Sequence, residues 1–319
     1  MTDLIPLIGS IFIAFVIGSN DASNALSICI GSNVVKFNKA VVVFGLFVFL
    51  GMIAQGEKVM RTVGKDLLEV NVSILGVALI VSALLIAISN WKRLPLSSHQ
   101  VIIGSLAGSG YATDIAVNVS SLVKIVFSWI ISPAGAFIFA LILYKIMEKT
   151  LSGLPLFRLE MILRILLLSS GMLVAYNTGA NELATVLGGP LYAGLITTRQ
   201  ASLVGPLLVF LGAVLLSSRV IETVGKGITV LDPFSGFAAQ FGAATSVLVF
   251  TTLGMPISTT YCIIGGIVGV GVLKGMGTVR FELIKKMLIS WVLTPLSAFA
   301  LCFALTKALQ YLPKLSAWM

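Results

Sequence analysis

Long apolar stretches alternate with short polar ones along the whole chain, and each half of the sequence contains five of them. They cover residues 4–30, 40–56, 71–90, 96–110 and 117–147 in the first half and 160–188, 201–217, 233–253, 257–273 and 287–309 in the second. Most approach the length of about 20 residues that a helix needs to cross a bilayer. The pattern predicts an all-α polytopic membrane protein.

Composition agrees with this interpretation. Of the 319 residues, 58% are hydrophobic and 10% are charged, and the formal net charge is +9. In a soluble protein that charge would suggest nucleic acid, but here the basic residues lie between the apolar stretches, as expected for membrane topology. The first stretch has no basic residue before it and is polar in its middle, so we expect it to remain as a span. We predict a multi-pass protein of the cell membrane that contacts the lipid bilayer and no nucleic acid.

The two halves of the sequence repeat one another. "RTVGKD" from Arg61 returns as "ETVGKG" from Glu222, and "PLSSHQVIIGSLAG" from Pro95 returns as "PISTTYCIIGGIVG" from Pro256, both displaced by 161 residues. "VFLG" recurs at the same displacement. A displacement held over such a length indicates an internal duplication. We therefore divide the chain into a first repeat, 1–157, and a second repeat, 158–319.

Five segments in each repeat would place the repeats in opposite orientations across the membrane. Basic residues test this, because cytoplasmic loops carry an excess of Lys and Arg. With both termini outside, 14 of the 21 Lys and Arg residues fall on the cytoplasmic side, six fall outside and Lys124 lies in a segment. We therefore predict two inverted-topology repeats with the N-terminus and the C-terminus outside.

Polar residues and an acid interrupt an apolar segment in each repeat. "GSNDASN" contains Asp21, and the displacement of 161 residues gives it Glu182, in "NTGANELAT", as its counterpart. A break in a helix at membrane depth persists only where protein, water or ions satisfy the freed backbone groups. Carboxylate, amide and carbonyl oxygens suit Na⁺, or a proton carried by the acid itself. The alternative is that both acids only bind helix ends or neighbouring polar residues. Matching interrupted segments in two inverted halves are typical of a transporter's midplane site.

The segments 96–110 and 257–273 are barely long enough to cross, and each opens with Pro and hydroxyl residues. Either segment spans the bilayer or re-enters it, and each reads as a helix start. The free N–H groups, the hydroxyls and the positive end of the helix dipole make a site for a tetrahedral oxyanion. The alternative is that the hydroxyls only cap their own helices. The candidate anion-binding residues are Ser97, Ser98, Ser258, Thr259 and Thr260.

His99 is the only histidine, and its repeat counterpart is Thr260. A symmetric site therefore does not require imidazole chemistry. Ser98 and His99 are adjacent on the expected helix and should point apart, which argues against a nucleophile and base pair. We predict no catalytic residues and no enzymatic activity.

"GSNDASNA" and "NTGANELATVLGGP" together resemble the paired signature motifs of the PiT inorganic phosphate transporter family, in which a "GANDVANA"-like sequence occurs once in each half. The resemblance covers essentially the full chain and implies a sodium- or proton-coupled phosphate symporter of inverted halves. Glu182 stands where the second motif has aspartate, and Thr185 where it has asparagine. Some relatives carry sulfate, and the motifs do not distinguish the two anions. The matching residues are Asn20, Asp21 and Asn24 in the first motif and Gly179, Ala180 and Asn181 in the second.

Charge then predicts coupling. A divalent phosphate beside ionised Asp21 and Glu182 gathers about four negative charges, and neither motif contains Lys or Arg. Isolated ions in a low-dielectric medium cost on the order of tens of kcal/mol, so mobile cations must neutralise them. We predict at least two Na⁺ ions as co-transported ligands and no other cofactor. The sodium ligands predicted are Asn20, Asp21, Asn24, Asn181 and Glu182.

Three alternatives stay open at this point. Either acid could carry a proton instead, which would make the protein a proton-coupled phosphate or sulfate permease. A passive anion channel would need a continuous polar lining rather than two separate acidic breaks. An intramembrane hydrolase would need a nucleophile with a base or a cluster of metal ligands. A homodimer is compatible with the sequence, which does not determine the oligomeric state.

Overall fold

The computed structural model describes residues 3–92, 96–227, 232–275 and 281–311, and within these ranges the chain is helical and contains no strand. Each of the ten apolar stretches corresponds to a helix or to a continuous run of helices. The elements are α1 (Leu4–Gly31), α2 (Phe37–Arg61), η1 (Thr62–Asp66), α3 (Val72–Lys92), α4 (Ser98–Ala112), α5 (Val119–Leu151), α6 (Leu156–Asn177), η2 (Thr178–Leu183), α7 (Ala184–Tyr192), α8 (Thr198–Gly227), α9 (Pro233–Thr252), α10 (Thr259–Lys274) and α11 (Phe281–Tyr311), where η1 and η2 are π-helical turns.

Eight helical segments of the described ranges are long and apolar enough to cross a membrane. Large apolar side chains are exposed along their outer faces, among them Phe127 and Ile130 on α5 and Val292 and Leu296 on α11. Such faces would be unfavourable in water but suit contact with lipid. The predicted all-α, multi-pass membrane fold is confirmed.

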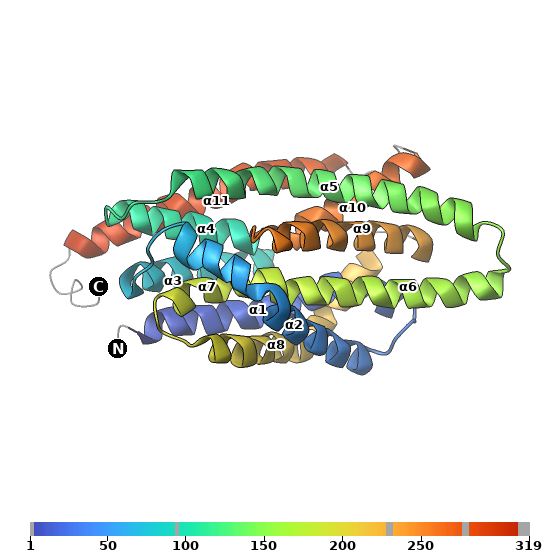
Figure 1. Ribbon diagram of the computed structural model, residues 1–319, viewed down its shortest axis with the longest axis horizontal. Coiled ribbons are helices and arrows are strands. Elements are labelled where there is room, and N and C mark those ends of the chain that lie inside the picture. The colour runs from blue at the N-terminus through green and yellow to red at the C-terminus, as the bar shows by residue number, and fades with distance from the viewer. Residues whose placement is uncertain (1–2, 93–95, 228–231, 276–280, 312–319) are drawn as a thin grey trace.

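The helices run roughly along the long axis of the molecule (Figure 1). The first turns of α1 and the last turns of α11 lie toward the same end of this axis, whereas the connection from α5 to α6 lies at the opposite end. Each half therefore makes a net odd number of passes along the axis. This arrangement agrees with the predicted inverted repeats, and the division between residues 157 and 158 stays a prediction.

Contacts between the halves follow the duplication. Helices α1 and α4 of the first half pack against α8 and α11 of the second half. The equivalent pairs, α6 with α2 and α10 with α5, are also in contact. The two halves are therefore interlocked rather than placed side by side.

Glycines allow two equivalent helix crossings. A Cβ atom on Gly18 would lie 2.0 Å from the carbonyl oxygen of Val209, and one on Gly179 would lie 1.9 Å from the carbonyl oxygen of Val48. These two contacts are related by the displacement of 161 residues. Small residues at such crossings let backbones approach closely, which is how membrane helices gain packing energy without a hydrophobic driving force.

The two helices α4 and α10 are too short to cross the bilayer alone. They contain 15 and 16 residues, or about 22 to 24 Å of helix, against a hydrocarbon core of about 30 Å. α4 packs against α3 and α10 against α9. A segment without helical structure, Leu253–Ser258, separates α9 from α10. The fold therefore contains broken helices, and their starts bring two sets of backbone donors into the interior.

Gly179→Ala should lower stability, because the new methyl group would overlap the backbone of Val48 and force the helices apart. Overpacking of this kind typically costs about 1–3 kcal/mol. Gly153→Ala is a matched control, since a Cβ atom there meets nothing within 4 Å. The unfolding temperatures of the detergent-solubilised variants should differ, with Gly153→Ala close to wild type. Equal unfolding temperatures for the two variants would contradict the crossing described here.

Candidate anion and cation site

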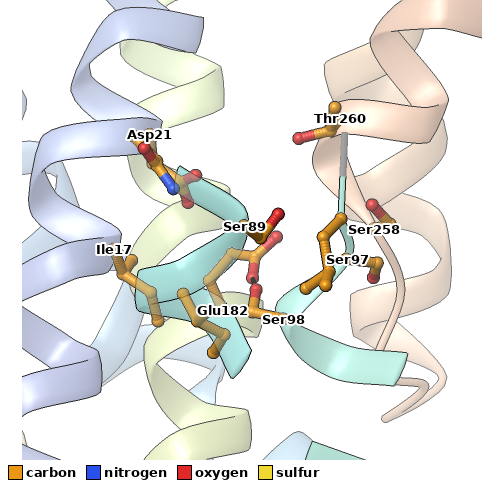
Figure 2. A pocket seen from close by; sticks show the side chains of 11 residues that line it. Ile17, Asp21, Ser89, Ser97, Ser98, Glu182, Ser258 and Thr260 are labelled. Carbon is orange, nitrogen blue, oxygen red and sulfur yellow. Dashed lines mark hydrogen bonds between the residues drawn. The ribbon is translucent and has the colours of Figure 1, made fainter. Parts of the chain in front are cut away.

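A pocket lies among the starts of α4 and α10, helix α1 and the π-helical turn η2 (Figure 2). Segments from both halves therefore contribute to it. Its lining residues are Ile17, Asn20, Asp21, Ile86, Ser89, Leu96, Ser97, Ser98, Glu182, Ser258 and Thr260.

The two helix starts present hydroxyl groups in different ways. Ser258 is the N-cap of α10, and its side chain accepts a hydrogen bond from the backbone N–H of Tyr261 at 3.4 Å. For Ser258 the capping alternative therefore applies. Ser97 is the N-cap of α4, but its buried hydroxyl makes no hydrogen bond, and neither does the buried hydroxyl of Thr259. These two hydroxyls are available to a ligand, because an unsatisfied buried polar group is unfavourable.

The pocket lies close to the pseudo-two-fold axis that relates the halves. Tyr261 donates a hydrogen bond from its hydroxyl to Gln100 Oε1 at 3.3 Å. These two residues are repeat counterparts, so their contact must lie near the axis. His99 and Thr260 each come one residue before this contact. The two helix starts therefore lie at equivalent distances from the axis.

Two buried carboxylates face this region from the two interrupted apolar segments. The expected break in the helix at Asp21 is wrong, because α1 runs continuously from Leu4 to Gly31, whereas Glu182 lies in the π-helical turn η2. Asp21 is 6% exposed and lies on α1, whereas Glu182 is 5% exposed and lies in η2. Asp21 Oδ2 makes no hydrogen bond, although the side chains of Thr178 and Asn24 lie near the carboxyl group. Glu182 Oε2 accepts a hydrogen bond from Ser98 Oγ at 2.8 Å. The two acids are close enough to repel each other when both are ionised.

His99 is a site residue that the sequence comparison of the repeats did not select. Its Nδ1 atom lies 3.2 Å from Glu182 Oε2, without satisfying hydrogen-bond geometry, and its side chain is buried. The expectation that Ser98 and His99 point apart is wrong, because both approach the same carboxylate oxygen. At the first turn of a helix a ligand near the axis can be reached by consecutive residues. The position of His99 directly after Ser98 in the hydroxyl motif was the available signal.

Asn181 is not among the pocket-lining residues, and its side chain holds the segment before α10. Its amide donates to Thr251 Oγ1 at 2.8 Å and to the carbonyl of Met255 at 2.9 Å. Its Oδ1 atom accepts from the backbone N–H of Ile257 at 3.1 Å. Asn181 thus satisfies the backbone where α9 ends and the chain turns toward α10.

Seven of the ten predicted site residues line the pocket, and the other three lie beside it. Asn24 donates to Thr260 Oγ1 at 3.4 Å, across the two halves. Thr259 approaches Glu182 through its backbone N–H and its hydroxyl, and Asn181 supports the connection to α10. The lining residues are Asn20, Asp21, Ser97, Ser98, Glu182, Ser258 and Thr260.

Chemically, the pocket combines hydroxyl donors at two helix starts with carboxylate and amide oxygens. None of the described residues that line it is Lys or Arg. The helix starts suit an oxyanion and the oxygens suit a hard cation. The arrangement can therefore bind ions of both signs close together.

A membrane protein of two inverted halves, with broken helices that converge on a polar pocket at their pseudo-axis, has the architecture of a secondary transporter. The sequence of the protein matches the model of the phosphate transporter family twice, over residues 17–158 and 157–302. The protein belongs to this family, and the predicted resemblance is confirmed. It is therefore a multi-pass integral membrane protein of a transporter family rather than of an enzyme family.

Individual relatives agree with this assignment. A protein named as a phosphate permease in Methanocaldococcus jannaschii is 35% identical over 95% of this chain and 96% of its own. The sulfate permease CysP of Bacillus subtilis is 28% identical over 96% of this chain and 87% of its own. A solved structure titled the sodium-dependent phosphate transporter superposes with a TM-score of 0.84 at 23% identity, covering 98% of this chain and 99% of that one. The last similarity shows that the fold is shared.

Proposed function

We propose that the protein imports inorganic phosphate by symport with sodium, with at least two Na⁺ ions for each phosphate. One observation carries the proposal: two buried carboxylates share a pocket with the starts of two helices, and no Lys or Arg is among its described lining residues. If this pocket binds an anion, its acids and its lack of basic lining residues mean that a cation from solution must balance the charge.

The anion would bind at the helix starts. The hydroxyls of Ser97 and Thr259 are buried without hydrogen-bond partners, and Ser98, Ser258 and Thr260 line the pocket beside them. A tetrahedral anion offers four oxygens, which two facing sets of donors can surround. Helix N-termini favour such ligands through their free N–H groups and dipoles.

The cations would bind on the acidic side of the pocket. Asp21 Oδ2 is buried without a hydrogen-bond partner, which makes it the strongest candidate for a cation ligand. Asn20 and Asn24 lie on the same helix, and Asn181 and Glu182 are the candidates from the second half. An ionised acid at this depth is unfavourable unless it is neutralised, so Na⁺ offsets both the acids and the phosphate.

Relatives guide the choice among ions. The solved structure of the same fold is titled a sodium-dependent phosphate transporter, and a relative in Bacillus subtilis is named a sulfate permease. Sodium is therefore the first cation to test and sulfate the first competing anion. A proton on either acid is the alternative means of neutralisation.

Purified protein in liposomes should take up labelled phosphate when an inward Na⁺ gradient is imposed, and much less under a proton gradient alone. Asp21→Asn should raise the Na⁺ concentration for half-maximal uptake about tenfold or more. The reason is that an interaction with a charged group contributes roughly 1.5–3 kcal/mol, and the variant loses the charge of the carboxylate. Uptake that is equal with and without Na⁺ at fixed pH would refute sodium coupling. Stronger inhibition by sulfate than by unlabelled phosphate would assign the anion differently.

Ser97→Ala combined with Thr259→Ala should weaken phosphate binding in saturating Na⁺ by about ten- to hundredfold, since a hydrogen bond to a charged ligand contributes roughly 1.5–3 kcal/mol. Ser217→Ala is a matched control, because Ser217 is also buried but bonds the carbonyl of Ala213 within its own helix. Equilibrium binding of labelled phosphate measures the difference. Unchanged affinity in the double variant would move the anion site elsewhere.

We also propose that both ends of the chain lie outside and that the connection from α5 to α6 is cytoplasmic, on the basis of the basic residues in the loops. A single cysteine introduced at Ser152 should then react with an impermeant thiol reagent only after the cells are opened. The background should be low, because the native Cys29, Cys262 and Cys302 are buried. Labelling of that cysteine in intact cells would reverse the orientation.

A further inference from the structure

The carboxylate of Glu182 lies where donors from both helix starts converge. Ser98 of α4 donates to Glu182 Oε2 at 2.8 Å, and His99 Nδ1 lies 3.2 Å from the same oxygen. From the other side, Thr259 of α10 approaches the carboxylate through its N–H and hydroxyl. Figure 2 shows the side chain of Glu182 extended toward Ser98. These donors are among those that the proposed function assigns to phosphate.

The counterpart acid, Asp21, has different neighbours: the side chains of Thr178 and Asn24 lie near its carboxyl group. Asp21 Oδ2 has no hydrogen-bond partner, although Asp21 lies at the equivalent position of the first half. Two differences separate these acids: Glu182 is longer by one methylene, or about 1.5 Å, and it lies in a π-helical turn rather than in a regular helix. Both differences affect how far a carboxylate reaches. The duplication therefore produced two acids with different environments.

We propose that Glu182 is a tethered anion that competes with the transported anion for the donors of α4 and α10. This role rests on the anion site proposed above. When Glu182 is ionised and extended, it occupies the hydroxyl of Ser98 and faces Thr259, so a phosphate ion would meet one occupied donor and a negative charge. Because the carboxylate belongs to the same chain, its effective concentration at the donors is high. Glu182 is thus a positioning residue that sets when the site accepts an anion.

A cation that binds Glu182 releases the donors. Na⁺ coordination neutralises the carboxylate and weakens its hold on Ser98, since hydrogen bonds to charged groups are the strong ones. Anion binding then becomes favourable, and by linkage the bound anion must favour the cation by the same factor. The binding of Na⁺ and the binding of the anion are then linked through the side chain of Glu182, and not only through the attraction between the two ions.

The test measures equilibrium binding of labelled phosphate to purified protein at fixed pH, first in sodium-free buffer with choline and then in saturating Na⁺. Glu182→Asp retains the charge but shortens the side chain, so it should bind phosphate in sodium-free buffer at least tenfold more tightly than wild type. Glu182→Gln should bind at least as tightly, and in both variants the enhancement by Na⁺ should shrink. Asp21→Asn is the matched control for loss of a nearby charge without release of donors.

The length variant separates the tether from simple repulsion. If only repulsion matters, Glu182→Asp will match wild type and Glu182→Gln will match Asp21→Asn, and either result overturns the proposal. Size-exclusion profiles and unfolding temperatures check that the variants are folded, and Glu182→Asp decides the question if Glu182→Gln is not. Wild-type binding without any response to Na⁺ would refute sodium coupling, whereas the tightening by Glu182→Asp would still support the tether. No binding of phosphate or sulfate to the wild type would overturn both proposals.

Discussion

Two carboxylic acids buried beside one another, without a basic side chain among the described residues of their pocket, are the constraint on which the rest of this structure depends. An isolated ionised carboxylate in a low-dielectric interior is so unfavourable that it must be paired, hydrogen-bonded or neutralised. Glu182 is partly satisfied by Ser98, whereas Asp21 Oδ2 lacks a partner. The pocket is therefore incomplete by itself, which is the property a coupled transporter requires and a purely structural cluster does not.

The duplicated fold supplies what this pocket needs. A helix offers free backbone donors only at its first turn, so two helix starts are needed to surround an anion. The inverted halves bring the starts of α4 and α10 together at the pseudo-axis. Interlocking supports this arrangement, because α4 packs against α11 and α10 against α5 from the opposite half. Close crossings at Gly18 and Gly179 hold the two interrupted segments against α8 and α2. Packing outside the pocket thus holds the backbone that carries both acids, and within the pocket Ser98 bonds the carboxylate of Glu182.

The helices and the pairing of motifs could be read from the sequence because both are encoded locally, in apolar length and in a constant displacement between the halves. Asp21 and Glu182 were recognised by the same displacement. Their different environments could not be, since a repeat comparison treats counterparts as equivalent. Whether Glu182 reaches Ser98 depends on a π-helical turn and on the placement of α4 from the other half. Asn181, proposed above as a cation ligand, also accepts a hydrogen bond from the backbone N–H of Ile257 before α10, a non-local contact that no spacing reveals.

The same asymmetry bears on why the protein can be a transporter rather than a channel. Equivalent residues differ in exposure: Asn20, Leu96 and Ser98 of the first half are partly exposed, whereas their counterparts Asn181, Ile257 and Thr259 are buried. A symmetric pocket would expose both sets equally. In these three pairs the residue of the first half is the more exposed one, whereas Thr260 is partly exposed and its counterpart His99 is buried. Because the halves have corresponding sequences and packing, exchanging these environments would give an arrangement of related contacts, and such near-equivalence of two states is what alternating access needs.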